Sequence, residues 1–200
     1  VVFFFYRAER NGDAGFTDQA AISEQGLSAL PLSTHLRRSY HDDWDGLMER
    51  RYIRVLTTLS RTNFYLSAGR LVGYEYAKLK EFENYINRGI SRRELRVVLE
   101  FIPVARDQLL PRLVEGYGDI AAAMLTVTPE RQQKVTFTTP YLTGIDEVVV
   151  THKDVSAPRD VADLSGRPVF VRASSSYYQS LQALNSRLRS QGLAPVRIIA

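Results

Sequence analysis

The sequence predicts an α/β protein built from parallel βαβ units. Short runs of β-branched and apolar residues alternate with longer amphipathic runs from residue 52 onward, which is the pattern of alternating strands and helices. Strand–helix–strand order favours parallel strands joined by crossover helices. The composition, with 44% hydrophobic and 24% charged residues in a chain of 200, is that of an ordinary globular protein.

The elements of the first half follow in order. Residues 52–58 are expected to form a β-branched strand, and apolar residues at helical spacing follow over 73–87. Residues 59–72 between them are expected to be a loop. A second strand is expected over 95–102, then a helix that Asp107 caps and that ends at Glu115. A third strand, of small residues, spans 119–124.

The second half repeats the alternation. Strands are expected over 144–151, 167–171 and 195–199, with an amphipathic helix over 176–190. The chain stops directly after the last strand, which would leave a sheet edge uncovered. We therefore expect this sequence to be a fragment of a longer protein, truncated at its C-terminus.

The first 50 residues are expected to be an arm ahead of the globular part. Residues 1–6 (VVFFFY) are too few for a membrane span, so they are either the remnant of a membrane anchor or an edge strand. The polar residues 8–34 are typical of a linker, and 35–51 of a short helix. The acidic run at Asp42 and Asp43 indicates a solvated helix start rather than a metal site.

Composition excludes several kinds of site. The chain has no cysteine, which excludes disulfides, thiolate zinc sites and cysteine nucleophiles. Its three histidines are scattered, so no metal or other cofactor is predicted. Residues 51–200 carry a net charge of +7, which favours anionic partners in general. The basic cluster of Arg88, Arg92, Arg93 and Arg96 is interpreted as a solvated face, and no nucleic-acid partner is expected.

The stretch 116–141 carries the strongest functional signal. It contains Gly118-Asp119, then Thr126-Val127-Thr128-Pro129-Glu130-Arg131, then Phe137-Thr138-Thr139-Pro140-Tyr141. In this order, and with the flanking strands, these motifs resemble the bacterial solute-binding proteins that include polar amino-acid receptors. The resemblance covers about residues 50–200. It implies a fold like that of type II periplasmic binding proteins, with two α/β lobes and a cleft between them, here 51–142 and an incomplete 143–200.

The resemblance also implies a site for a ligand carboxylate. Arg131 and Thr126 would bind the carboxylate, and the carbonyl of Met124 would accept a hydrogen bond from an ammonium group. A carboxylate that loses water in a cleft needs charge-assisted donors, which a guanidinium and the free N–H groups of a helix N-terminus supply. The alternative for Arg131 is a surface ion pair with Glu130 or another nearby acid.

A serine run matches the second half of the family's cleft. Ser174, Ser175 and Ser176 lie between a predicted strand and a predicted helix. The resemblance implies that Ser175 and Ser176 contact the same ligand carboxylate, so that the ligand bridges both lobes and favours a closed state. The alternative is that one serine simply caps the helix.

The first lobe matches the family pattern with one departure. Tyr65 would form an apolar wall of the pocket, or it is an ordinary core or loop aromatic residue. The family has an acid at the start of the following helix where this sequence has Ala77. Glu75 lies two positions earlier. It is either a substitute for that acid or, as we expect, a residue with a capping or surface role.

Residues 107–111 and 118–131 look most like the receptor-like module of membrane-bound lytic murein transglycosylases of the F type. This implies a periplasmic, membrane-anchored module that senses an amino acid or a peptidoglycan stem peptide (muropeptide) and regulates a catalytic domain downstream of residue 200. The catalytic signature of those enzymes is absent from these 200 residues, so no catalytic residue is predicted here. The alternatives are an amino-acid-binding receptor of an ABC transporter and an enzyme such as a dehydratase on the same fold, which would need a general acid or base.

Overall fold

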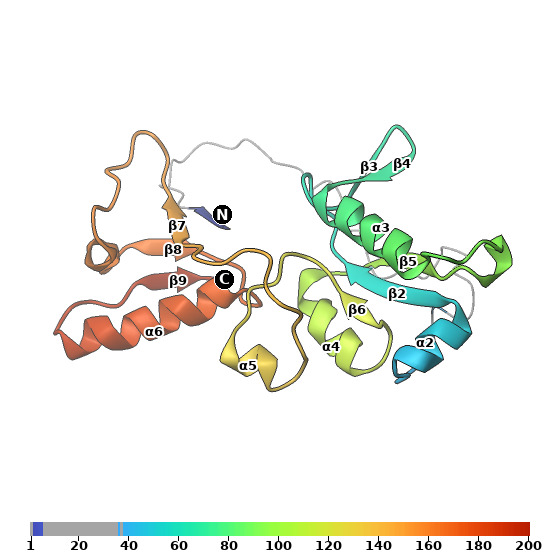
Figure 1. Cartoon of the computed structure of the whole chain (residues 1–200). Helices are drawn as coiled ribbons and strands as arrows, with labels where there is room; N and C mark the ends of the chain where they lie inside the picture. Colours follow the sequence, from blue (N-terminus) through green and yellow to red (C-terminus); the bar gives the residue numbers. More distant parts are fainter. Residues whose placement is uncertain (1, 6–35, 37) are drawn as a thin grey trace. The chain divides into compact units, whose positions relative to one another are not determined.

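The computed structural model describes residues 2–5, 36 and 38–200, and it divides the chain into two compact units (Figure 1). Unit 1 consists of residues 1–19 and 137–200, and unit 2 of residues 20–136. Each unit has its own sheet and its own apolar core. The predicted linker over 8–34 lies outside the described residues.

Unit 2 is built on a three-stranded parallel sheet with the order β5-β2-β6. The strands are β2 (Tyr52–Thr57), β5 (Val98–Pro103) and β6 (Ile120–Ala121). Because β2 pairs in parallel with both neighbours, the predicted βαβ arrangement is confirmed. β6 covers only two of the six residues expected, and Met124 beyond it has a φ of 47°, outside the region that strands adopt.

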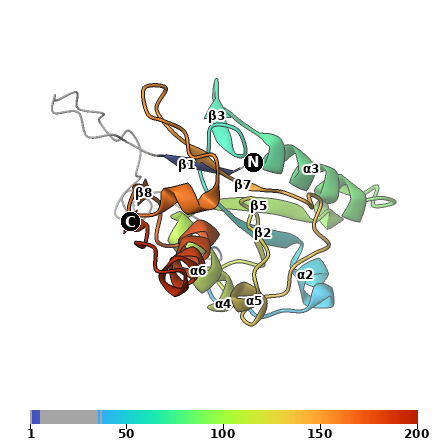
Figure 2. The ribbon, with the colours of Figure 1, turned by 90° about the vertical axis from the view of Figure 1, so that its left-hand side faces the viewer.

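Helices cover both faces of this sheet, and Figure 2 shows α3 and α4 on opposite sides of β2. α3 (Tyr74–Ile86) packs on the face that carries Ile53 and Val55, and α4 (Leu109–Val114) on the face that carries Leu56. Successive side chains of a strand point to opposite faces of the sheet, so β2 contributes to an apolar core on each face. β2 is buried on both faces for this reason.

Two of the predicted helices begin later than expected. Within the range 35–51 the structure has the α-helix α2 (Trp44–Arg50), and Asp43 caps it by accepting the Gly46 N–H at 3.0 Å. The prediction that Asp107 caps the next helix is wrong. Asp107 lies inside a 3₁₀ turn, Arg106–Gln108, that leads directly into α4, so Gln108 takes the cap position without a side-chain bond.

The segment expected to be a loop over 59–72 contains a small hairpin. β3 (Tyr65–Ser67) pairs antiparallel with β4 (Arg70–Val72). The turn residues Ala68 and Gly69 both have positive φ, at 47° and 76°, as the two-residue turns of hairpins require. The loop prediction failed because strands of three residues carry too little alternation to be seen in a sequence.

Unit 1 contains a four-stranded mixed sheet with the order β7-β1-β8-β9. β7 (Glu147–Val150), β8 (Pro168–Phe170) and β9 (Arg197–Ile199) are the three strands that the sequence predicts, each somewhat shorter. β1 (Val2–Phe5) pairs parallel with β7 and antiparallel with β8. The apolar N-terminal run is therefore a strand, but it lies inside the sheet rather than at an edge.

α6 (Ser176–Ser190) supplies Leu181, Leu184 and Leu188 to the core of unit 1, as the sequence predicts. Asn185 on the same helix is buried. It donates to the Val196 carbonyl at 3.0 Å and accepts the Val196 N–H at 2.6 Å, which attaches α6 to the segment before β9. Neither α6 nor any other helix in the described part of the chain has the length and apolar character needed to cross a membrane.

Candidate functional site

The loop after β6 brings Thr126 and Arg131 into contact. α5 (Pro129–Gln132) is a single helical turn, and Thr128 is its N-cap. The Arg131 guanidinium donates from Nη1 to the Thr126 carbonyl at 2.9 Å, and the Arg131 backbone N–H donates to the Thr128 hydroxyl at 3.4 Å. This arginine is therefore held through its side chain and through its backbone.

α5 offers fewer backbone donors to an anion than the sequence indicates. Pro129 has no N–H, and the N–H of Arg131 is directed to Thr128. A one-turn helix also develops little of the dipole that a longer helix has. An anion at this loop would thus depend chiefly on the Arg131 guanidinium, which donates from Nη1 to the Thr126 carbonyl.

A buried carboxylate fixes the start of this loop. Glu75 in the first turn of α3 has only 8% of its surface exposed, and its Oε1 accepts the backbone N–H of Met124 at 2.6 Å. Met124 has a positive φ, a conformation that costs free energy in a residue other than glycine. The prediction of a capping or surface role for Glu75 is wrong, because its side chain turns inward to the loop after β6. The role of the Met124 carbonyl stays a prediction.

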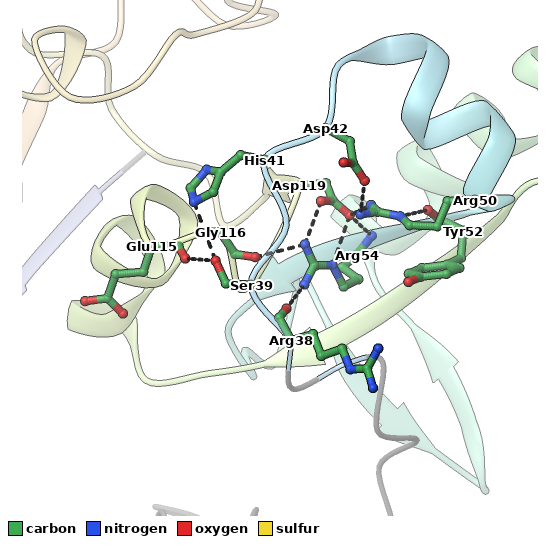
Figure 3. A network of polar contacts seen from close by, with 10 residues as sticks. All are labelled: Arg38, Ser39, His41, Asp42, Arg50, Tyr52, Arg54, Glu115, Gly116 and Asp119. Atoms are coloured by element: carbon green, nitrogen blue, oxygen red, sulfur yellow. Dashed lines mark hydrogen bonds and ion pairs between the residues drawn. The ribbon is translucent and has the colours of Figure 1, made fainter.

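Asp119, the acid of the Gly-Asp motif, lies between two arginines, as Figure 3 shows. Its Oδ1 accepts from Nη2 of Arg54 at 2.8 Å, and its Oδ2 accepts from Nη2 of Arg50 at 2.6 Å and from the Arg54 backbone N–H at 2.8 Å. Arg54 is completely buried. Its guanidinium also donates to the carbonyls of Arg38 at 2.6 Å and Gly116 at 2.9 Å. We call these ion pairs and hydrogen bonds the Asp119 network.

The Asp119 network attaches residues 38–42 to β2 and α2 within unit 2. Arg50 pairs with Asp42 at 2.8 Å (Figure 3). The guanidinium groups of Arg50 and Arg54 lie over the Tyr40 ring at 4.7 and 4.8 Å. Asp42 therefore forms an ion pair with Arg50, and Asp43 caps α2. Within the described ranges, no group of three histidine or acidic side chains is placed to hold a metal ion.

Sequence reasoning missed this network, although a signal was present. Arg54 is a charged residue in the middle of an otherwise apolar strand, where a buried charge requires a partner. Gly118 also serves the fold, because a Cβ at that position would lie 2.3 Å from Cγ of the buried Leu56. Both residues of the Gly-Asp motif are thus explained by packing and ion pairing within unit 2.

The pKa values of the network follow from its geometry. Burial raises the pKa of Asp119, but the hydrogen bonds from Arg54 and Arg50 lower it more, so this pKa lies below the ordinary value. Burial, with the hydrogen bond to Tyr40, raises the pKa of Tyr52 to about 12. Asp119 is therefore ionised and fully engaged at neutral pH, which is unsuited to a general acid or base.

Tyr65 begins β3 and has 36% of its surface exposed, and the next residue, Leu66, has 65% exposed. Tyr65 is therefore not a core residue of unit 2, and part of its ring faces solvent. Its proposed role as a pocket wall stays a prediction.

The serine run lies at the start of α6 in unit 1. Ser175 is the N-cap residue, but its hydroxyl donates to the Arg172 carbonyl at 2.7 Å and makes no bond to the helix. The Ser175 side chain therefore does not cap α6, although Ser175 occupies the cap position. Ser174 is exposed and Ser176 is buried. Contact of these serines with a ligand stays a prediction.

The chain is similar in sequence to two kinds of protein. Membrane-bound lytic murein transglycosylase F of Desulfosudis oleivorans is 31% identical over 150 residues, which cover 75% of this chain and 31% of that protein. The probable ABC transporter extracellular-binding protein YckB of Bacillus subtilis is 26% identical over 141 residues, which cover 68% of this chain and 46% of that protein. The chain thus spans about a third to a half of the length of these relatives. The predicted resemblance to membrane-bound lytic murein transglycosylases of the F type is confirmed.

The fold is similar to that of solved amino-acid-binding proteins. An ancestral amino acid-binding protein, a precursor of cyclohexadienyl dehydratase, has a TM-score of 0.59 at 24% identity, over 78% of this chain and 63% of that one. This confirms the predicted type II periplasmic-binding-protein fold. Residues 53–192 match the model of the bacterial extracellular solute-binding proteins, family 3. This chain belongs to that family.

Proposed function

We propose that this chain is a regulatory module of a lytic murein transglycosylase, and that it recognises the carboxylate of an amino acid or a peptidoglycan stem peptide. The observation that carries the proposal is the geometry of Arg131, held by the Thr126 carbonyl and the Thr128 hydroxyl. A guanidinium matches a carboxylate in shape and charge, and it binds one through two parallel hydrogen bonds.

Other residues of the proposed site have different roles. Thr126 would donate its hydroxyl or N–H to the carboxylate, and the Met124 carbonyl would accept from a ligand ammonium group. Tyr65 would contact the apolar part of the ligand. Ser174, Ser175 and Ser176 would add polar contacts from unit 1. The exposure of Thr126, Tyr65 and Ser174 supports these roles, since a ligand must reach them.

The proposed setting is the periplasm, in a protein attached to a membrane. It is supported by the relatives named as membrane-bound transglycosylases, which are longer than this chain. The proposed catalytic domain would lie in the part of the parent protein that these 200 residues do not include. Ligand binding to the module would then regulate that domain.

A second candidate function is that of an amino-acid receptor of an ABC transporter. The similarity to the extracellular-binding protein of Bacillus subtilis favours it. The two candidates differ in the ligand they require: a transporter receptor binds a free amino acid, whereas a murein sensor prefers a stem peptide.

Calorimetric titration of the 200-residue chain with amino acids and with stem peptides tests the proposal. Each ligand is paired with its carboxamide, which keeps the shape and removes the negative charge. We expect the acid to bind and the amide to fail. Arg131→Ala should raise the Kd about 10- to 100-fold, because a hydrogen bond to a charged group contributes about 1.5–3 kcal/mol.

The matched control is Arg61→Ala, which removes the same charge from an exposed position in unit 2. It should leave the Kd unchanged. Equal binding of the acid and the amide, or normal binding by Arg131→Ala, would contradict the proposed carboxylate site. Preference for a free amino acid over every stem peptide would favour the transporter receptor.

A further inference from the structure

A second charged surface of unit 2 is formed by the segment between α3 and β5 together with Arg51, which precedes β2. It consists of five exposed arginines, which we call the arginine face: Arg51, Arg88, Arg92, Arg93 and Arg96. The segment that carries four of them contains one acid, Glu94. Figure 1 shows this segment projecting from one end of unit 2. The sequence analysis interprets four of these arginines, all except Arg51, as a solvated face.

Three of these arginines have no acidic partner in the described part of the chain. No ion pair is formed there by Arg92, Arg93 or Arg96. Arg51 donates to the backbone carbonyl of Glu94 at 3.0 Å, and Arg88 lies over the Tyr85 ring at 4.8 Å. Neither contact neutralises a charge, so the positive potential of the face is preserved.

The backbone under the arginine face is fixed. The buried Asn87 donates to the Val97 carbonyl at 2.8 Å and accepts the Val97 N–H at 2.8 Å, which joins the two ends of the segment. The Arg51 bond to Glu94 holds its middle. Arg93 and Arg96 are three residues apart across a 3₁₀ turn, so their side chains leave from the same side. The charges are thus presented together by an ordered support.

Apolar side chains lie among these arginines. Tyr85 is 60% exposed, Leu95 41% and Val98 51%. Arginines beside an amphipathic tyrosine and small aliphatic residues suit the boundary between lipid phosphates and acyl chains. Tyr85 is the one ring in this set, and Arg88 already lies over it. A single-stranded nucleic acid, whose successive bases stack on several rings, is therefore a poorer match.

We propose that the arginine face binds the surface of a membrane that contains anionic phospholipid. The strands of unit 2 are parallel, so all of them begin at one end of the sheet and finish at the opposite end. The residues before β2 and β5 lie at the end where the strands begin, and the loop after β6 lies at the end where they finish. Arg51 and Arg96 lie at the end where the strands begin, and Arg131 lies in the loop after β6, at the opposite end. A module docked in this way keeps the candidate ligand loop away from the lipid. The inference does not depend on the ligand proposed above.

Flotation of the 200-residue chain with lipid vesicles tests the inference. We expect binding to vesicles of phosphatidylcholine with phosphatidylglycerol, none to phosphatidylcholine alone, and release at about 1 M salt. The triple variant Arg92→Gln, Arg93→Gln, Arg96→Gln should lower the partition coefficient on the order of a hundredfold, since each basic residue near an anionic surface contributes about a factor of five. Tyr85→Ser should lower it further at constant charge.

The matched control changes three other exposed arginines, Arg61→Gln, Arg187→Gln and Arg189→Gln, and should retain most of the binding. Absence of vesicle binding, an equal loss in both triple variants, or preference for a short oligonucleotide over vesicles would overturn the inference. The arginine-face variant should keep the calorimetric response to carboxylate ligands. A failure of vesicle binding is thereby separated from a failure of the proposed ligand site.

Discussion

Two arginines of unit 2 show how differently the same side chain is used. Arg54 is completely buried, and its guanidinium donates to the Asp119 carboxylate and to two backbone carbonyls. Arg131 is partly exposed, and its guanidinium donates to the carbonyl of Thr126. Arg54 is thus part of a buried ion pair, whereas Arg131 lies partly at the surface of the loop after β6.

The comparison explains why two neighbouring motifs have separate purposes. Asp119 and Arg131 are only 12 positions apart in the sequence, and both belong to the stretch that resembles the solute-binding family. Asp119 satisfies a buried charge, and so it contributes to stability. Arg131 is the residue that we propose binds a ligand carboxylate. Substitutions at the two positions should therefore separate stability from binding.

The largest effect is expected for Asp119→Asn. The variant removes the negative charge that faces the buried Arg54 and the adjoining Arg50, and an uncompensated buried charge costs about 3–5 kcal/mol. Urea unfolding monitored by circular dichroism measures the change in free energy of unfolding. Asp107→Asn, at an exposed position of the same unit, should change it by less than about 0.5 kcal/mol.

The same network predicts a dependence of stability on pH. The pKa of Asp119 is lower in the folded chain than its ordinary value of 3.8. As the pH falls below about 4, Asp119 takes up a proton in the unfolded chain before it does so in the folded chain. The free energy of unfolding therefore decreases until the pH is below the pKa of Asp119 in the folded chain. Asp119→Asn should lack this component. An equal acid dependence in the variant and the wild type would show that other carboxylates cause it.

A smaller effect is expected for substitutions of Glu75, the buried acid that holds the start of the loop after β6. Glu75→Ala removes the acceptor of the Met124 N–H, and leaving a buried donor unsatisfied costs about 1–3 kcal/mol. Because Met124 begins the loop that ends at Arg131, ligand affinity should fall as well. Glu75→Gln keeps a side-chain oxygen that can accept the Met124 N–H, so it should lose less stability and less ligand affinity than Glu75→Ala.

Glu81→Ala on the exposed side of α3 is the control for this prediction, because its ion pair with Lys78 is solvent-exposed. Urea unfolding and calorimetry are the measurements. Unchanged stability in Glu75→Ala would contradict the role given to the bond with Met124.

The sequence predicted the fold best where periodicity was long. The helix over 176–190 and the strand over 52–58 are observed close to their predicted bounds, since each contributes several side chains to an apolar core. The hairpin of β3 and β4 was missed because its strands are too short for a periodic signal. The place of β1 inside a sheet depends on pairing with strands more than 140 residues away, which no local pattern reveals.

The candidate site was predictable as a set of residues rather than as a set of contacts. The motif singled out Thr126 and Arg131, but it could not indicate that Thr126 contributes its carbonyl to the arginine. The burial of Glu75 was also missed, because inward and outward positions in the first turn of a helix differ only through tertiary packing. Contacts of this kind depend on the folded chain as a whole.

The smallest effect is expected for Thr128→Ala, which removes the cap of α5 and the acceptor of the Arg131 N–H. Loss of a threonine cap costs about 0.5–1 kcal/mol, and here the bond is long at 3.4 Å. Thr126→Ala is its counterpart, because Thr126 holds Arg131 through a backbone carbonyl that the variant retains. We expect Thr128→Ala to lower stability slightly and Thr126→Ala to leave it unchanged. If the Thr126 hydroxyl also binds the carboxylate, Thr126→Ala should weaken ligand binding more than Thr128→Ala does. The reverse order would assign the hydroxyl contact to Thr128, and unfolding and titration of both variants side by side would decide between the two.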